Sequence, residues 1–148
     1  MKKILCFLII LSGTIHFSFA QDKKINEALV PMAVVDSFKV KYKKLEIKSW
    51  YDSDGNYAAA FIKGATEFKA TFTVDGKWLR TSTEIKEEAV SGAVKKSIKN
   101  TEWKDWKIGD CYKVETPEIK KLFVLHMKKG KEKKILTFDP LGKAVDIK

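Results

Sequence analysis

The chain has 148 residues, with 29 Lys and Arg against 19 Asp and Glu and a formal net charge of +10. Its 45% hydrophobic residues, with only 3 Pro and 8 Gly, exclude an intrinsically disordered chain and a collagen-like repeat. Two His and two Cys are too few for a multi-cysteine zinc module or a disulfide-dense mini-protein. The composition therefore indicates a folded domain.

The first twenty residues have the pattern of a signal peptide. Two lysines precede an apolar run over residues 4–11, and Ser18-Phe19-Ala20 supplies the small residues that signal peptidase requires. The run is broken by polar residues from Ser12 on and is shorter than the roughly 20 residues of a membrane span, which disfavours a membrane anchor. We expect cleavage after Ala20 and a periplasmic or secreted mature protein without a transmembrane anchor.

Cleavage would also remove two lysines, Cys6 and His16 but no acid, leaving 27 basic and 19 acidic residues and a net charge of +8. Cys111 and His126 are then the only cysteine and histidine. No internal disulfide can form, and we expect Cys111 to be buried as a small hydrophobic residue.

Residues 21–148 form one domain, in which two similar halves, about 27–84 and 85–148, are predicted from internal matches. The matches are Val30, Ala33, Val34 and Ser37 with Val90, Ala93, Val94 and Ser97, at an offset of 60, and Thr71-Phe72 with Thr137-Phe138, at an offset of 66. The change of offset indicates insertions in the loops of the second copy.

Taken in chain order, each half predicts one helix followed by four strands. Apolar residues at helical spacing predict a helix over 31–43 and a shorter one over 89–98, where Ser91 and Gly92 are poor helix formers. Alternating apolar residues predict strands over 45–51, 57–62, 68–74 and 78–81, and over 106–115, 122–128, 134–139 and 144–147. Short turns at Asp54-Gly55 and Asp75-Gly76 favour antiparallel pairing. The expected fold class is α+β, a tandem repeat of one helix plus a four-stranded antiparallel sheet.

The segment from Asp52 to Asn56 has oxygen ligands at alternate positions, as in a calcium loop. Tyr57, however, stands where such a loop needs glycine, and Lys63 stands where it needs a bidentate acid. A hairpin turn is the better interpretation, and we expect no metal site.

Catalytic motifs are equally weak. His126 lies in a predicted strand, without a nucleophile elbow or a Cys–His arrangement around it, and the paired carboxylates are adjacent or in turns. No glycine-rich phosphate loop is present. We expect no catalytic residues, no enzyme activity and no cofactor, and an enzyme centred on His126 or Cys111 is the weakest hypothesis.

The basic residues give one candidate binding site. Arg80 is the only arginine of the mature chain, and lysines lack the planar fork that recognises bases, so nucleic acid is not an expected partner. The densest basic run, residues 128–134, is typical of a solvated hairpin; the alternative is a site for a small ligand or an anionic polymer. Its candidate residues are Lys128, Lys129, Lys131, Lys133 and Lys134.

The aromatic residues give a second candidate, a face made by Trp50, Tyr57 and Trp78. Trp50 is out of phase with Ile47 and Tyr51, which would turn it to the water-facing side, where a large aromatic often marks a contact surface. A position in the core, reached through a strand bulge that reverses the phase, is the equal alternative for Trp50, and a core position is the favoured one for Tyr57 and Trp78.

These segments resemble the PepSY-like, beta-lactamase-inhibitor-like family of exported Gram-negative proteins. The matching residues are Val30-Pro31-x-Ala33-Val34-x-x-Ser37-Phe38-x-x-Lys41-Tyr42, then Trp50, Gly55-x-Tyr57-x-Ala59-x-Phe61 and Asp75-Gly76-Lys77-Trp78-Leu79-x-Thr81. The likeness covers nearly all of residues 27–148, although Ser91 replaces the usual proline in the second copy. The resemblance implies a tandem helix-plus-sheet fold, a periplasmic location and a binding or inhibitory role without established catalytic residues.

The leading functional hypothesis is a non-catalytic periplasmic module that binds an unknown protein or peptide of the cell envelope through an exposed sheet face. Such a module could modulate a peptidase. The alternative is the binding of a small ligand or anionic polymer through the lysine-rich hairpin.

Overall fold

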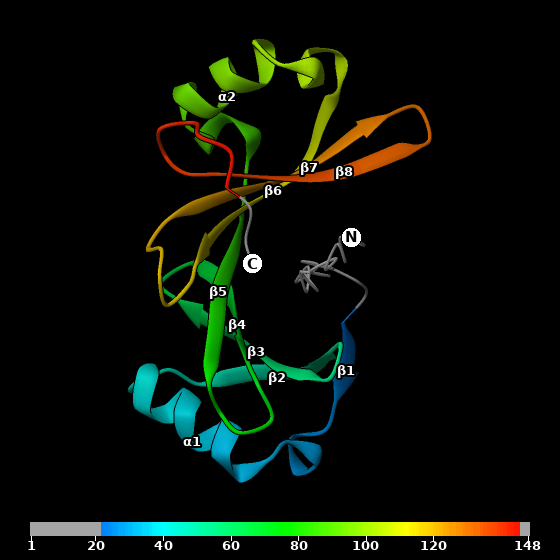
Figure 1. Cartoon of the computed structure of the whole chain (residues 1–148). Coiled ribbons are helices and arrows are strands. Elements are labelled where there is room, and N and C mark those ends of the chain that lie inside the picture. Colours follow the sequence, from blue (N-terminus) through cyan, green and yellow to red (C-terminus); the bar gives the residue numbers. More distant parts are fainter. Residues whose placement is uncertain (1–21, 146–148) are drawn as a thin grey trace, which may run out of the picture.

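The computed structural model describes residues 22–145, which fold into one eight-stranded antiparallel sheet with the strands in chain order (Figure 1). The strands are β1 (Lys23–Ile25), β2 (Ile47–Ser53), β3 (Asn56–Lys63), β4 (Thr66–Phe72), β5 (Trp78–Ile85), β6 (Lys107–Glu115), β7 (Leu122–Lys129) and β8 (Glu132–Phe138). The predicted signal peptide lies outside the described residues. In the described part of the chain, no helix has the length and apolar character to span a bilayer.

Both predicted helices are present, and the second is the shorter. They are α1 (Met32–Lys41) and α2 (Gly92–Lys99), and three single-turn 3-10 segments lie at Glu27–Leu29, Glu87–Ala89 and Glu102–Asp105. The Ser91 side chain accepts a hydrogen bond from the backbone N–H of Val94 at 3.3 Å. Ser91 therefore caps the start of α2, a role that suits a residue that is a poor helix former in a helix interior.

The predicted fold class is wrong in one respect: the chain is not a tandem repeat of a helix plus a four-stranded sheet. β5 pairs with β6 through five residues, from Thr81 opposite Glu115 to Ile85 opposite Cys111, so the strands of both halves form a single sheet. This pairing satisfies backbone groups that two separate sheets would leave open at their edges. The ends of the sheet also differ from the prediction. β1 was not predicted, and the last predicted strand is only a bridge between Phe138 and Ala144.

Both helices pack on the same side of the sheet. Ala70, in the core under α1, is the cross-strand partner of Thr81 on β5. Cys111, in the core under α2, is the partner of Ile85, four residues further along the same strand. Side chains two apart on a strand share a face, so the two cores are on one face. The sheet twists strongly, and the helices lie at opposite ends on the outer side of its bend (Figure 1).

A tight turn packs against each helix, and a glycine lies where the turn comes closest to the helix. The turn at Gly76 has φ +85°, and a Cβ there would lie 2.5 Å from the carbonyl oxygen of Ala33. The turn at Gly142 has φ +83°, and a Cβ there would lie 2.6 Å from the carbonyl oxygen of Ala93. Both glycines are required by close approach to the helix as well as by their left-handed backbone.

We predict that Gly76→Ala is much more destabilising than Gly55→Ala. Gly55 also has a positive φ, +80°, but a Cβ there would meet nothing within 4 Å. Gly55→Ala should therefore cost only the backbone term of about 1–2 kcal/mol, whereas Gly76→Ala adds a clash with helix backbone and should cost roughly 1–3 kcal/mol more. Urea unfolding of both variants measures the difference, and equal losses would contradict the close packing of this turn against α1.

Candidate functional site

Trp50 is buried in the core under α1, with 2% of its surface exposed. The pairing of β2 with β3 shifts between Ile47 and Ser49, and this irregularity inserts one residue into the alternation. Ile47 and Trp50 consequently lie on the helix side, and Tyr51 lies on the other side. The expected exposure of Trp50 is thus corrected in favour of the bulge alternative, and Trp50 offers no contact surface.

Trp78 and Tyr57 are only partly buried, but both pack against the core under α1. The indole N–H of Trp78 donates to the hydroxyl of Thr81 at 3.0 Å, and the ammonium of Lys41 lies 3.4 Å from the centroid of the Trp78 ring. The hydroxyl of Tyr42, at the end of α1, also hydrogen-bonds to Thr81. The three predicted aromatic residues therefore belong to the helix side of the sheet, where they hold α1 in place.

The other side of the sheet carries no helix in the described chain, and we call it the helix-free face. By the register of the ladders, the side chains on this face include those of Ser49, Tyr51, Ala58, Ala60, Ile62, Glu67, Lys69, Thr71, Arg80, Ser82, Glu84, Lys107, Tyr112, Val114, Leu122, Val124, His126, Lys128, Lys133, Ile135 and Thr137. Val114, Leu122 and Val124 form a small third core on this face, packed with Ile119 and Val145. Elsewhere the face exposes two large apolar side chains, Ile62 at 48% and Ile135 at 42%.

A charged cluster occupies the helix-free face near β1. The ammonium of Lys69 lies 2.6 Å from the carboxylate of Asp22 and 4.7 Å from the ring centroid of Tyr51. Burial lowers the pKa of the Arg80 guanidinium, and the carboxylates of Asp22 and Asp54 partly offset this effect. The Lys69 ammonium is therefore paired with Asp22, and the negative charges of Asp22 and Asp54 act on Arg80 as well.

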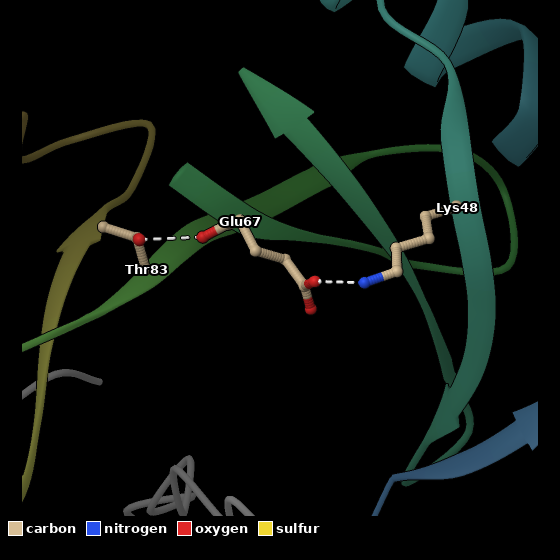
Figure 2. Close-up of polar contacts among 3 residues, drawn as sticks. All are labelled: Lys48, Glu67 and Thr83. Atoms are coloured by element: carbon tan, nitrogen blue, oxygen red, sulfur yellow. Dashed lines mark hydrogen bonds and ion pairs between the residues drawn. The ribbon is translucent and has the colours of Figure 1, made fainter. Parts of the chain in front are cut away.

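At the rim of the same sheet, Lys48 and Glu67 form an ion pair at 2.8 Å that links β2 to β4 (Figure 2). The hydroxyl of Thr83 on β5 donates to the backbone oxygen of Glu67, also at 2.8 Å. Both side chains of the ion pair are more than half exposed, so the pair contributes little to stability. The ion pair places one positive and one negative side chain next to each other at this rim of the sheet.

The lysine-rich hairpin is confirmed as the exposed β7–β8 turn, but its lysines do not form one site. Strand alternation places Lys128 and Lys133 on the helix-free side, whereas Lys129 and Lys134 lie on the helix side. Lys131 is at the turn. The sequence run therefore separates into two faces and a tip.

Cys111 and His126 lie on opposite faces of the sheet. Cys111 is buried in the core under α2, whereas the His126 ring packs with Tyr112, at 5.3 Å between centroids, on the helix-free face. The Nδ1 atom of His126 lies 3.6 Å from a carboxylate oxygen of Asp110. A Cys–His catalytic pair is therefore excluded by the geometry, because the sheet itself separates the two side chains.

The segment from Asp52 to Asn56 is the β2–β3 turn. Asp54 and Gly55 both have positive φ, and the Asp52 carboxylate accepts a hydrogen bond from the Gly55 N–H at 3.1 Å. These are the features of a two-residue hairpin turn. Over residues 22–145, no three His, Cys, Asp or Glu side chains gather in a way that could hold a metal ion.

We predict that Thr81→Val lowers the free energy of unfolding by about 1–3 kcal/mol, because it leaves the Trp78 N–H and the Tyr42 hydroxyl without their shared partner. The matched control is Thr83→Val on the same strand, whose exposed hydrogen bond should cost under about 1 kcal/mol. Guanidinium unfolding followed by tryptophan fluorescence measures both. Equal effects would show that the cluster around Thr81 does not hold α1.

We also predict that Cys111 is unreactive in the folded protein. Burial raises the pKa of its thiol to about 11, so the thiolate fraction at pH 8 is very small and the sulfur is covered by α2. Iodoacetamide should label Cys111 only after unfolding, as detected by intact-mass spectrometry. Fast labelling of the native protein at pH 8 would reopen a nucleophilic role.

Comparisons with known proteins match this architecture. The family model described as beta-lactamase-inhibitor-like and PepSY-like matches residues 55–145. A BLIP-like protein of Bacteroides fragilis is 26% identical, with a TM-score of 0.63, over 76% of this chain and 81% of that one. A DUF2874 family protein of Bacteroides uniformis is 19% identical, with a TM-score of 0.66, over 78% and 86%.

A third solved structure, from Bacteroides eggerthii, is titled as one of the "putative periplasmic proteins"; it is 22% identical, with a TM-score of 0.65, over 78% of this chain and 86% of that one. No protein with a curated description matches the sequence. The family match spans more than half of the chain and coincides with the strands from β3 to β8, and the chain therefore belongs to the PepSY-like, beta-lactamase-inhibitor-like family.

Proposed function

We propose that the protein is a non-catalytic periplasmic binding module that holds a protein or peptide partner against the helix-free face of its sheet. The single observation that supports this role is the placement of both helices on one side, which leaves the opposite side without a helix in the described chain. The exposed and partly exposed side chains on that side, which include Ile62, Ile135 and Tyr112, can contact a partner. The resemblance of the family to inhibitor-like proteins points the same way, by analogy only.

The chemistry of the face supports a protein partner. Ile62 of β3 and Ile135 of β8 are about half exposed, and Tyr51 of β2 and Tyr112 of β6 are partly exposed on the same face. Exposed apolar and aromatic side chains surrounded by charges are the composition of protein contact surfaces. Modulation of a peptidase is one consequence that such binding could have.

The test is capture of periplasmic proteins on the immobilised mature chain. We predict that Ile62→Ser combined with Ile135→Ser reduces recovery of a partner at least about fivefold, because hydrophobic contacts of roughly 1 kcal/mol or more are lost. The control is Val40→Ser combined with Leu141→Ser, which removes side chains that are 71% and 84% exposed on α1 and in the turn beside α2.

Both double variants should unfold within about 1 kcal/mol of the wild type, since the residues are exposed. Equal recovery of the partner by wild type and the Ile62/Ile135 variant would remove the helix-free face as the contact surface. Loss of recovery in the control alone would move the contact to the helix side.

A further inference from the structure

Three lysines from three neighbouring strands stand in one row on the helix-free face. Lys107 of β6 is the cross-strand partner of Lys128 of β7, and Lys128 is in turn the partner of Lys133 of β8. Neighbouring strands are about 4.8 Å apart, so the row spans roughly 10 Å. We call Lys107, Lys128 and Lys133 the lysine ladder.

The rest of the hairpin does not share this arrangement. Met127 belongs to the core under α2, so its neighbour Lys128 points to the opposite face, and Lys129 returns to the helix side. Lys129 faces Glu132 across the strands, which gives it an acidic neighbour. Only in the lysine ladder does each cation face another cation.

Like charges directly opposite each other destabilise a sheet. Within residues 22–145, none of the three ladder lysines forms an ion pair or a hydrogen bond through its side chain. Asp110, an acid of the same strand as Lys107, lies 3.6 Å from His126. The ladder is thus a concentration of positive charge without a counter-charge of its own.

The backbone of β6 makes room for this row. A Cβ at Gly109 would lie 3.3 Å from Cε and 3.4 Å from Nζ of Lys128. The Lys128 side chain therefore extends across the strand boundary and lies over Gly109, toward the strand that carries Lys107. A larger residue at position 109 would crowd the Lys128 side chain and displace its ammonium from this position over β6.

We propose that the lysine ladder is an oxyanion site that binds the phosphate group of a ligand. Each ammonium is a compact charge with three hydrogen-bond donors, and a phosphate group offers several acceptor oxygens and up to two negative charges. A bound phosphate bridges neighbouring lysines and removes their mutual repulsion. The site goes beyond the binding of a protein partner and does not depend on it, because it needs only the register of β6, β7 and β8.

The experiment is calorimetric titration of the mature protein with inorganic phosphate and with pyrophosphate at low ionic strength. The test variant replaces the ladder by glutamine: Lys107→Gln, Lys128→Gln and Lys133→Gln. The control variant, Lys129→Gln, Lys131→Gln and Lys134→Gln, changes the net charge by the same amount in the same hairpin. We expect the ladder variant to bind pyrophosphate at least roughly tenfold more weakly, and the control to lose less than about threefold, since only the ladder contributes direct hydrogen bonds.

A second arm decides the source of the phosphate. Vesicles of phosphatidylglycerol are sedimented with wild type and both variants, and phosphatidylcholine vesicles serve as the reference. Sedimentation that is lost in the ladder variant and kept in the control assigns the site to a lipid headgroup, whereas phosphate binding without sedimentation assigns it to a soluble phosphate ligand.

The proposal is overturned if both variants lose binding equally, which would mean that net charge alone attracts the anion, or if wild type binds neither phosphate, pyrophosphate nor anionic vesicles. Thermal unfolding provides a check on folding. The ladder variant should melt at the same temperature as wild type or higher, because its cross-strand repulsion has been removed. No protein partner is used in this experiment, so a negative result would not bear on the protein-binding proposal, which has a separate test.

Discussion

The pairing of β5 with β6 is the constraint from which the rest of the architecture follows. It continues one hydrogen-bonded ladder across the middle of the chain, so side-chain alternation is also continuous from Thr81 to Ile85 and on to Cys111. Two helices that follow the same local pattern must then pack on the same side of the sheet. The other side carries no helix in the described chain and holds the small core of Val114, Leu122 and Val124 beside polar, charged and aromatic side chains, so the two sides of the sheet differ in what covers them.

Local patterns in the sequence predicted the elements well, and long-range pairing poorly. Helical spacing identified α1 and α2, and alternation with short turns identified β2 to β8 within a few residues. Periodicity indicates which residues share a face of a strand, but it does not indicate which other strand lies beside it. The joining of the two halves into one sheet was therefore missed. β1 was missed because three residues are too short to show a period, and the expected strand over 144–147 is only a bridge at Ala144.

The candidate site residues show the same limit. One extra residue between Ile47 and Ser49 reverses the face of Trp50, and nothing in the alternating sequence around it reveals the irregularity. Trp78 looked available for contact, but its N–H is already bound to Thr81, a residue of the same strand. Lys107 was absent from the predicted basic site because 21 positions of sequence separate it from Lys128, and only the register of β6 and β7 brings the two together.

The same alternation also explains why contact and charge are better candidates for function than reactive groups. On β6, Cys111 points into the core under α2, where burial raises its thiol pKa to about 11 and suppresses nucleophilicity. On β7, His126 and Lys128 point to the other face, together with Ile135 and Lys133 of β8. The sheet thus holds Cys111 and His126 on opposite sides and aligns three exposed lysines in register on one face. The repulsion in that row has to be balanced by solvent, salt or a bound anion, and an anion with several acceptors both offsets the positive charge and accepts hydrogen bonds from neighbouring lysines.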